Sequence, residues 1–374
     1  MDPDRRPRLS PAIADVRRAV RAALPSVADN SSRENEGDQR PDGTRNGVEG
    51  APATSSPSFS APLVLVALSG GPDSLALAAA TAFEAPRLGL RAGAVIVDHG
   101  LQHGSADVAA AAAQQAQLLG LAPVLVRTVH VGTFGGPESA ARDARYSALA
   151  AVALELGARA VLLGHTLDDQ AETVLLGLAR GSGATSLQGM AAETGMYVRP
   201  LLGIRRSTTV QFCEDSGLDA WLDPQNDDEA FTRVRVRHAV LPVLEAELGP
   251  GVAEALARTA DQLREDAAAL DHFAEEMAED FAEIVEAGIA LPVNALAAQP
   301  PALRQRLIRF VVASEFHLSL SRTQTLEIAR LVTDWHGQKP LDVPGVKVER
   351  RGGRIVFTAT GVGELTGNDP ILEH

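Results

Sequence analysis

The residues with the clearest chemical capacity lie in a Gly-rich turn at positions 69–74. The turn follows the wholly apolar run 63–68 and reads Ser69, Gly70, Gly71, Pro72, Asp73 and Ser74. Two consecutive glycines let the backbone turn sharply and come close to a ligand, and a helix starting near Ser74 directs its free amides at an anion. The pattern therefore indicates a phosphate site. The alternative is a plain strand-to-helix turn with Ser or Asp as its cap.

Asp73 sets this turn apart from a Walker P-loop. A Walker loop requires a lysine, and the chain has only Lys339 and Lys347, both far downstream. The same absence excludes a Schiff-base lysine in the first 338 residues. Because a carboxylate repels phosphates unless a divalent cation lies between them, we expect Mg²⁺ at Asp73.

A second polar group occupies positions 164–173, after an apolar run, and opens a predicted helix. Asp169 and Glu172 are three positions apart, so they share one helical face and can clasp a single cation, either a metal or an ammonium group. In the alternative, the acids only complement the helix dipole. Arg145 lies in an earlier helical stretch on the same side as Glu138 and Arg142, which is either a solvated face or a means of holding phosphate at the strand ends.

The elements that must position these residues alternate along the chain. Apolar strand candidates at 93–97, 123–127 and 160–164 are separated by Ala-rich helical stretches at 74–84, 105–119 and 138–157. This alternation predicts an α/β fold with a doubly wound parallel sheet, whose ligands gather at the carboxyl ends of the strands. The ends carry the turn 69–74, then Asp98, His99 and Gly100, then the group beginning Gly164 and His165. We expect these residues to converge, although His165 in a purely structural role stays an alternative.

The rest of the chain divides by composition. We expect an amphipathic leading helix at 1–27, a disordered insert at 28–61, the sheet domain at 62–245, a helical connector at 246–290 and a small α+β domain at 291–374. Within the sheet domain, 197–202 reads as an edge strand and 205–216 as a helix. The connector contains a helical pattern at 252–287. In the last domain we expect helices near 301–313 and 322–333, and a hairpin that turns at Gly352 and Gly353.

Basic residues cluster in two places of an otherwise acidic chain, whose formal net charge is −14. Arg233, Arg235 and Arg237 alternate, which suits a strand face or one side of a helix, and they either contact a polyanion or form ion pairs on a surface helix. Arg350 and Arg351 lie in the predicted hairpin, where phosphate-backbone contact would follow from their charge.

Composition narrows the class of protein. The single cysteine, Cys213, fits a reducing compartment and excludes a disulfide framework or a cysteine-rich metal site. No stretch approaches a membrane span, and an N-terminus with six arginines in its first 21 residues is not a secretory signal. We therefore expect a cytoplasmic protein with no membrane contact.

Together the motifs resemble a known family. The turn 69–74 is similar to the PP-loop of the N-type ATP pyrophosphatases, which adenylate a substrate and release pyrophosphate. Within that superfamily, the order of 97–101, 138–146, 164–173 and 180–183 resembles the tRNA(Ile)-lysidine synthetases over about 62–242. The resemblance implies an adenine nucleotide alpha hydrolase-like fold. It also implies ATP-dependent ligation of free L-lysine to C2 of the wobble cytidine in the isoleucine tRNA with a CAU anticodon. In a departure from longer members of the family, we expect no extra C-terminal domain; a homodimer is one assembly that we consider.

The resemblance also implies roles for individual residues. Asp73 helps to place Mg²⁺, Arg145 holds the adenylated intermediate, and Asp169 and Glu172 grip the substrate lysine. The expected ATP ligands are Ser69, Gly70, Gly71, Pro72, Asp73, Ser74, His99, Gly164 and His165. The expected tRNA contacts are Arg233, Arg235, Arg237, Arg350 and Arg351.

Other functions on this fold have less support. A tRNA thiolase needs cysteines for persulfide transfer or an iron–sulfur cluster, and Cys213 alone supplies neither. An amidotransferase-type ligase needs a glutaminase nucleophile, for which no domain of suitable length is present. A non-catalytic nucleotide- or RNA-binding module stays open.

Overall fold

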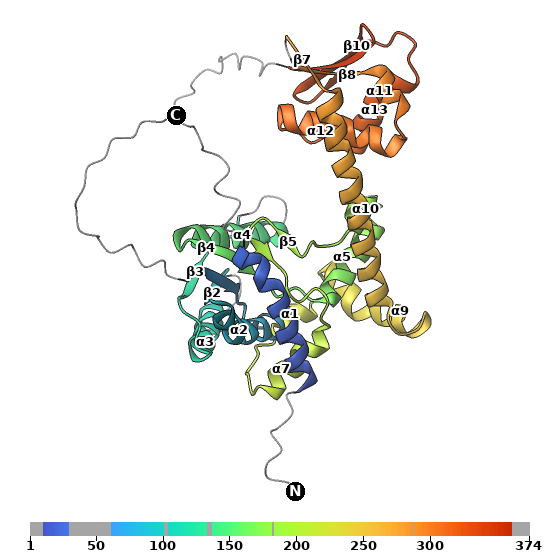
Figure 1. Ribbon diagram of the computed structural model, residues 1–374. Helices are drawn as coiled ribbons and strands as arrows, with labels where there is room; N and C mark the ends of the chain where they lie inside the picture. Colours follow the sequence, from blue (N-terminus) through green and yellow to red (C-terminus); the bar gives the residue numbers. More distant parts are fainter. Residues whose placement is uncertain are drawn as a thin grey trace, which may run out of the picture. The chain divides into compact units, whose positions relative to one another are not determined.

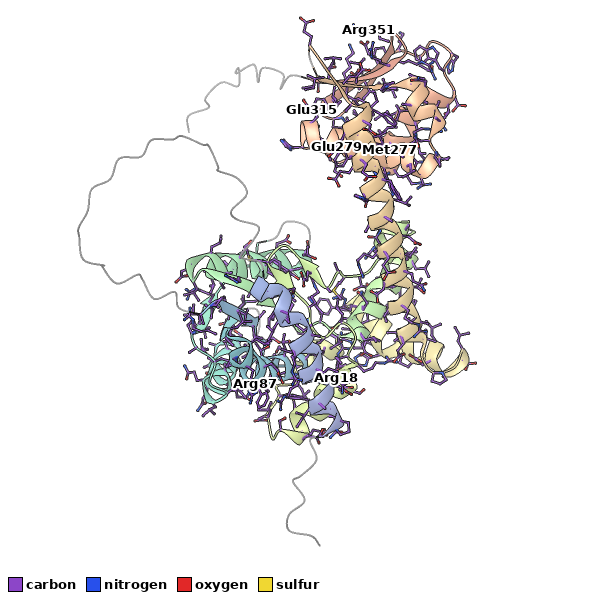
Figure 2. The ribbon with its side chains drawn as sticks, in the orientation of Figure 1. Arg18, Arg87, Met277, Glu279, Glu315 and Arg351 are labelled. Carbon is purple, nitrogen blue, oxygen red and sulfur yellow. The ribbon has the colours of Figure 1, made fainter. Side chains whose placement is uncertain are left out.

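The computed structural model describes residues 10–29, 61–100, 104–132, 137–181, 183–286 and 288–360. Its elements are shown in Figure 1 and their side chains in Figure 2. The chain forms two compact units, Met1–Asp261 and Gln262–His374. The predicted insert at 28–61 lies outside the described residues except at its two ends. None of the helices described is long and apolar enough to cross a membrane.

A six-stranded sheet organises the first unit. Its order is β3-β2-β1-β4-β6-β5, with every neighbouring pair parallel except β5 and β6. The strands are β1 (Leu63–Ala67), β2 (Arg91–Asp98), β3 (Val124–Thr128), β4 (Ala158–Leu162), β5 (Glu193–Thr194) and β6 (Tyr197–Val198). The doubly wound fold is therefore confirmed, and its topological switch point lies between β1 and β4, where such sheets bind ligands.

Helices cover both faces of this sheet (Figure 1). The helices of this unit are α1 (Pro11–Asp29), α2 (Pro72–Glu84), α3 (Ser105–Leu118), α4 (Pro137–Glu155), α5 (Leu167–Ala179), α6 (Ala184–Leu187), α7 (Arg206–Asp215), α8 (Thr232–Arg235), α9 (Leu241–Glu247) and the first part of α10 (Val252–Phe281), which continues into the second unit, with 3-10 turns η2 (Ala85–Leu88) and η3 (Pro224–Asp227) and the π-turn η4 (Val236–Val240). Alternate residues of β1 enter different cores. Val64 and Val66 pack with α1, α2, α3 and α7, whereas Leu63 and Leu65 pack with α4.

Two predicted elements of this unit are resolved differently from expectation. The edge strand expected at 197–202 is only Tyr197–Val198 long, because Pro200 has no amide for a ladder and the chain turns after it. The basic segment after Phe231 is helical, as α8 and η4, so the strand alternative is wrong.

The leading helix is confirmed and packs on the sheet domain. Val16, Val20 and Leu24 are fully buried in the core shared with α2 and α7. The carboxylate of Glu84, itself almost fully buried, accepts from Arg17 Nε at 2.9 Å and from Arg21 Nε at 2.8 Å. The hydrogen bond with Arg21 leads the causes that lower the pKa of Glu84 to about 2.

The second unit contains an antiparallel sheet of order β7-β8-β11-β10-β9. Its elements are β7 (Glu283–Val285), β8 (Gly288–Pro292), α11 (Val293–Ala298), α12 (Pro301–Phe316), α13 (Arg322–Thr333), β9 (Leu341–Val343), β10 (Val346–Arg351) and β11 (Arg354–Ala359). The expected helix 252–287 ends at Phe281 instead, because 283–285 pair with β8. The predicted hairpin is confirmed, and Gly352 and Gly353 turn it with φ of 58° and 74°.

Candidate active site

The Gly-rich turn joins β1 to α2 and lines a cleft with Ser69, Gly71 and Asp73. Gly70 has φ of 86°, a conformation that glycine adopts without strain, and its carbonyl accepts from the Trp221 amide at 2.9 Å. Helix α2 starts at Pro72, and its N-cap, Gly71, places no side chain on the first-turn amides. The Ser74 hydroxyl instead accepts from the Ser69 amide at 3.1 Å and donates to the Gly71 carbonyl at 3.0 Å. The turn thus has the geometry of an anion site at a helix N-terminus.

The end of β4 packs directly against this turn. A Cβ at Gly164 would lie 3.1 Å from the carbonyl carbon of Asp73 and 3.1 Å from Cα of Ser74. Glycine at this position therefore lets the end of β4 approach the first turn of α2 without a close Cβ contact. This contact places His165 and the start of α5 beside the phosphate turn.

The predicted strand-end residues converge on one cleft of about 570 Å³. Its lining includes Ser69, Gly71, Pro72, Asp73, Ser74, His99, Arg145, Gly164, His165 and Asp169. Among the predicted catalytic and ATP-binding residues, two do not line it. Gly70 shapes the turn without facing the cleft, and Glu172 lines a smaller neighbouring cavity of about 160 Å³. Arg206 and Arg237 line both spaces.

Two histidines in this cleft have an imidazole nitrogen available to a ligand. Nδ1 of His99 and Nδ1 of His165 are buried, and neither has a hydrogen-bond partner within the described part of the chain. Burial lowers the pKa of His165 to about 4 and also lowers the pKa of His99. Both rings are therefore neutral at physiological pH, when each can donate from one nitrogen and accept at the other.

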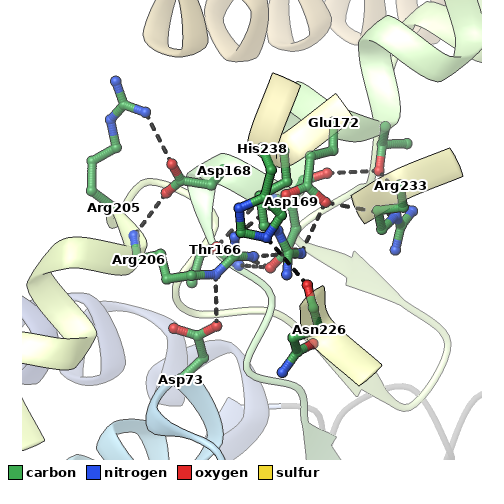
Figure 3. A network of polar contacts seen from close by, with 12 residues as sticks. Asp73, Thr166, Asp168, Asp169, Glu172, Arg205, Arg206, Asn226, Arg233 and His238 are labelled. Carbon is green, nitrogen blue, oxygen red and sulfur yellow. Dashed lines mark hydrogen bonds and ion pairs between the residues drawn. The ribbon is translucent and has the colours of Figure 1, made fainter. Parts of the chain in front are cut away.

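The acid pair, Asp169 and Glu172, contributes both to the cap of α5 and to contacts with cations (Figure 3). Oδ2 of Asp169 accepts from the Thr166 amide at 2.8 Å and from its hydroxyl at 2.9 Å, which completes a capping box at the start of α5. Oδ1 of Asp169 instead faces Arg206 Nη2 at 2.6 Å and Arg237 Nη2 at 3.4 Å. Glu172 is fully buried and receives Arg237 Nε at 2.7 Å and Nη2 at 3.1 Å. The pair therefore clasps cations, and in this structure the cations are arginines.

Arg206 is the central residue that sequence reasoning missed. It reaches three carboxylates, with Nε 3.3 Å from Asp73, Nη2 2.6 Å from Asp169 and Nη1 3.4 Å from Glu172. Burial alone would lower the pKa of Arg206. The negative charges of Asp169, Asp73 and Glu172 outweigh this effect, so the pKa of Arg206 lies above its ordinary value. One signal was available, since Arg205 and Arg206 open a helix, where positive charge is unfavourable unless acids lie nearby.

The pKa values of the acids reflect the same contacts. Burial raises the pKa of Asp73 above its usual range, and the Arg206 charge only partly opposes this. Burial acts in the same direction on Asp169, but Arg206 and the Thr166 amide outweigh it, so the pKa of Asp169 is lowered. Asp169 is therefore the more firmly ionised of the two.

Arg205 anchors the beginning of α7 on the outer side of this network. It contacts Asp168 at 3.0 Å, Glu245 at 3.1 Å and Glu254 at 2.7 Å. Asp168 also accepts from the Arg206 amide at 2.7 Å. These contacts fix the helix end from which the Arg206 side chain reaches the acid pair (Figure 3).

Arg145 is the cleft arginine without an anionic partner in the described residues. Its guanidinium lies 5.9 Å from the Tyr146 ring centroid, and no carboxylate pairs with it in the part of the chain that the structure describes. Burial lowers its pKa, and Arg142 and Arg233 lower it further. A positive charge in this setting favours binding of an anion such as phosphate.

The arginines expected to contact tRNA lie in different settings. Arg233 and Arg237 point to the acid pair, with Arg233 Nε 3.7 Å from Glu172. Arg235 donates to backbone carbonyls of Glu229 and Ala230. In the second unit, Arg350 donates to the Leu331 carbonyl at 2.9 Å, whereas Arg351, labelled in Figure 2, is largely exposed. Contact with tRNA stays a prediction for all five.

The side chains of the cleft could hold Mg²⁺ only together with the phosphates of a bound substrate. Among the described residues there is no group of three or more His, Cys, Asp or Glu side chains that could hold a metal ion. Magnesium is often bound through one or two carboxylates plus substrate phosphates, so a single carboxylate at the phosphate turn fits it. Asp73 is that carboxylate, although Thr209 and Arg206 contact its oxygens here.

Comparison with known proteins agrees with this geometry. A family model described as a PP-loop domain matches residues 51–244, and one described as the TilS substrate binding domain matches residues 291–356. A tRNA(Ile)-lysidine synthase of Leifsonia xyli is 60% identical over 339 residues, covering 90% of this chain and 99% of that protein. Those of Streptomyces coelicolor and Thermobifida fusca are 54% and 53% identical over 79% of this chain, and 85% and 92% of their own lengths.

One solved structure is also similar. The U34-tRNA thiolase NcsA from Methanococcus maripaludis with its [4Fe-4S] cluster aligns with a TM-score of 0.49 at 19% identity, covering 68% of this chain and 80% of that chain. The relatives of 53–60% identity and the matched PP-loop model show the family directly. This chain belongs to the tRNA(Ile)-lysidine synthase family.

Proposed function

We propose that this chain ligates free L-lysine to C2 of the wobble cytidine in the isoleucine tRNA with a CAU anticodon, converting ATP to AMP and pyrophosphate. The observation that carries the proposal is the arrangement at the switch point of the sheet. A phosphate turn after β1, an acid pair after β4, and Arg145 of α4, which has no anionic partner among the described residues, are gathered there.

In the first step, the cytidine O2 attacks the α-phosphorus of ATP and pyrophosphate leaves. The first-turn amides of α2, which receive no side-chain cap, would hold the phosphates, and Asp73 would hold Mg²⁺, which would offset their charge. The neutral His99 and His165 line the nucleotide cleft. Positioning and charge stabilisation carry this step, and no protein nucleophile is needed.

In the second step, the ε-amine of lysine attacks C2, and AMP leaves with the electrons of the C2–O2 bond. Arg145 faces the phosphate of the adenylated cytidine, because its charge has no carboxylate partner in the described residues. Asp169 and Glu172 hold the lysine ammonium before it loses its proton and attacks. The target base must leave its stack to reach the α-phosphate.

The remaining arginines are expected to contact the tRNA. Arg235, Arg350 and Arg351 offer positive charge to the phosphate backbone. Arg233 and Arg237 belong to the acid pair in this structure, so we expect them to act near the reacting base. The cytoplasm is the expected location, and a homodimer is one assembly to be tested.

A sulfur-transfer reaction finds no support at this site. The only cysteine is Cys213, and it is buried. Burial is the main cause that raises the pKa of its thiol to about 11. A protonated thiol is a poor nucleophile, so Cys213 does not supply persulfide chemistry.

The test is lysine incorporation. The protein is incubated with ATP, Mg²⁺, labelled lysine and the CAU-anticodon tRNA transcript. We expect labelled tRNA from the wild type, little from Asp73→Ala, and wild-type amounts from Asp107→Ala, which removes an exposed acid from the first turn of α3. Absence of incorporation by the wild type, or incorporation unaffected by Asp73→Ala, contradicts the proposal.

A further inference from the structure

The acid pair has no oxygen left for a substrate ammonium. Oδ2 of Asp169 is held by Thr166, and its Oδ1 by Arg206 and Arg237. Oε1 of Glu172 faces Arg237 and Arg206. Its Oε2 accepts from Arg237 and lies 3.7 Å from Arg233. If lysine is to bind here, at least one guanidinium must give way.

Burial explains why arginines occupy the site. Glu172 is fully buried and Asp169 nearly so. An unpaired buried carboxylate is strongly destabilising, so the site needs compensating cations whenever substrate is absent. Three carboxylates, Asp73, Asp169 and Glu172, meet three guanidiniums, which belong to Arg206, Arg233 and Arg237. Adding a lysine ammonium to this balanced cluster leaves one positive charge too many.

The contacts differ in how easily they are released. Arg237 grips Glu172 with two nitrogens, at 2.7 and 3.1 Å. Arg206 has one short contact, to Asp169 at 2.6 Å, and two longer ones, to Asp73 at 3.3 Å and Glu172 at 3.4 Å. Bidentate pairs hold better than single contacts. Arg206 also has a second carboxylate, Asp73, on the ATP side, to which it can turn.

We propose that the guanidinium of Arg206 occupies the ammonium site while lysine is absent. Lysine then displaces this guanidinium from Asp169 and Glu172 toward Asp73. This inference rests on the proposed function. Arg206 acts through the carboxylates that it contacts, so it is a positioning residue. Its guanidinium neutralises the acid pair until the substrate amine arrives, and afterwards it lies nearer the phosphate turn. Lysine binding therefore moves a positive charge toward the ATP side of the cleft.

The proposal predicts that removing the competitor tightens lysine binding. The measurement is the Kd for L-lysine by calorimetry on the full chain, together with the rise in Tm that lysine causes. We expect Arg206→Gln to bind lysine about tenfold more tightly, the equivalent of one charge-assisted hydrogen bond no longer competed for. Its Tm without lysine should be lower and the lysine-induced rise in Tm larger, because the acid pair then lacks a partner.

Two further variants keep the test sharp. Arg206→Lys cannot reach three carboxylates at once, so its Kd should fall between those of wild type and Arg206→Gln, and it serves if the latter does not fold. Arg17→Gln is the matched control, since Arg17 also pairs with a buried carboxylate, that of Glu84 at 2.9 Å, but lines neither the ATP cleft nor the small cavity at Glu172. We expect its lysine Kd to stay within threefold of wild type.

Each outcome decides the matter. Lysine binding that is unchanged or weaker in both Arg206 variants overturns the inference, as does equal tightening in Arg17→Gln. Lysine incorporation into tRNA by the wild type separates this result from failure of the proposed function. If incorporation occurs but the Arg206 variants bind lysine no more tightly, the displacement is wrong and the activity stands.

Discussion

Glu172→Gln tests the acid pair with a change of charge and almost none of shape. The side chain is fully buried, and its contacts are Arg237 Nε at 2.7 Å, Arg237 Nη2 at 3.1 Å, Arg206 Nη1 at 3.4 Å and Arg233 Nε at 3.7 Å. Glutamine keeps one acceptor oxygen and replaces the other with a donor that faces guanidinium. The three arginines then face two carboxylates instead of three.

The magnitude follows from these contacts. Breaking a buried ion pair by neutralising one partner costs about 3 kcal/mol of unfolding free energy, near the lower end of the usual range because Gln retains one acceptor. For substrate, losing one charge-assisted contact of about 2 kcal/mol raises the KM for lysine about thirtyfold. The KM for ATP should change little, since Glu172 does not line the ATP cleft.

The assays are urea unfolding and initial rates of lysine incorporation at varied lysine and varied ATP. The control is Glu155→Gln, which breaks a half-exposed ion pair with Arg127 at 2.8 Å. Such surface pairs contribute about 0 to 1 kcal/mol, so this variant should resemble the wild type in both assays.

Two results would refute the reasoning about Glu172. One is an unfolding free energy for Glu172→Gln equal to that of Glu155→Gln, which would mean that the buried contacts contribute nothing net. The other is an equal rise in the KM for lysine and for ATP, which would place Glu172 in general support of the cleft rather than at the ammonium.

Three further substitutions test other parts of the first unit. The pKa of Glu84 is about 2 in the fold against 4.5 ordinarily. Its contribution to stability is therefore present above pH 4.5 and lost as the pH falls toward 2, and Glu84→Gln should flatten the unfolding free energy over that interval. Gly164→Ala should raise the KM for ATP and lower the unfolding free energy by about 1–3 kcal/mol, because the added Cβ meets the backbone of the phosphate turn. The control is Gly203→Ala, which should change neither quantity because the space around Gly203 is open. Asp169→Asn keeps an acceptor for Thr166 but loses the charge, so lysine incorporation should fall far more than Tm, and parallel losses would contradict this.

Local patterns in the sequence were enough to predict the phosphate turn and its sheet. The apolar run before Ser69 could only be a buried strand, and Gly70 adopts the positive φ for which glycine is suited. General rules for doubly wound sheets place ligands at the carboxyl ends of the strands, and this brings His99 and His165 to the same cleft.

The arginine partners of the acid pair could not be predicted in the same way. Arg206 and Asp73 are 133 positions apart, and Arg237 and Glu172 are 65 apart. Helical periodicity says nothing about contacts across such distances. The joining contacts are tertiary, such as the Leu167 amide donating to the Ile204 carbonyl at 2.9 Å, which ties the chain before α7 to the start of α5. For the same reason, the basic run that includes Arg237 suggested an open polyanion surface although two of its arginines face buried acids.

Asp169 combines a helix cap with a cation contact, because its two oxygens face different partners; its binding of a metal or of an ammonium group stays a prediction. Oδ2 completes the cap of α5, and Oδ1 faces guanidinium. The cap fixes the carboxylate in one orientation, so the side chain loses little further conformational entropy when its other oxygen binds a cation. Glu172, one turn later, has no such cap and depends on Arg237 for its orientation. A substrate amine therefore meets one carboxylate fixed by the backbone and one held by a side chain, and this asymmetry explains why Arg206 is the cation that can leave while Arg237 stays.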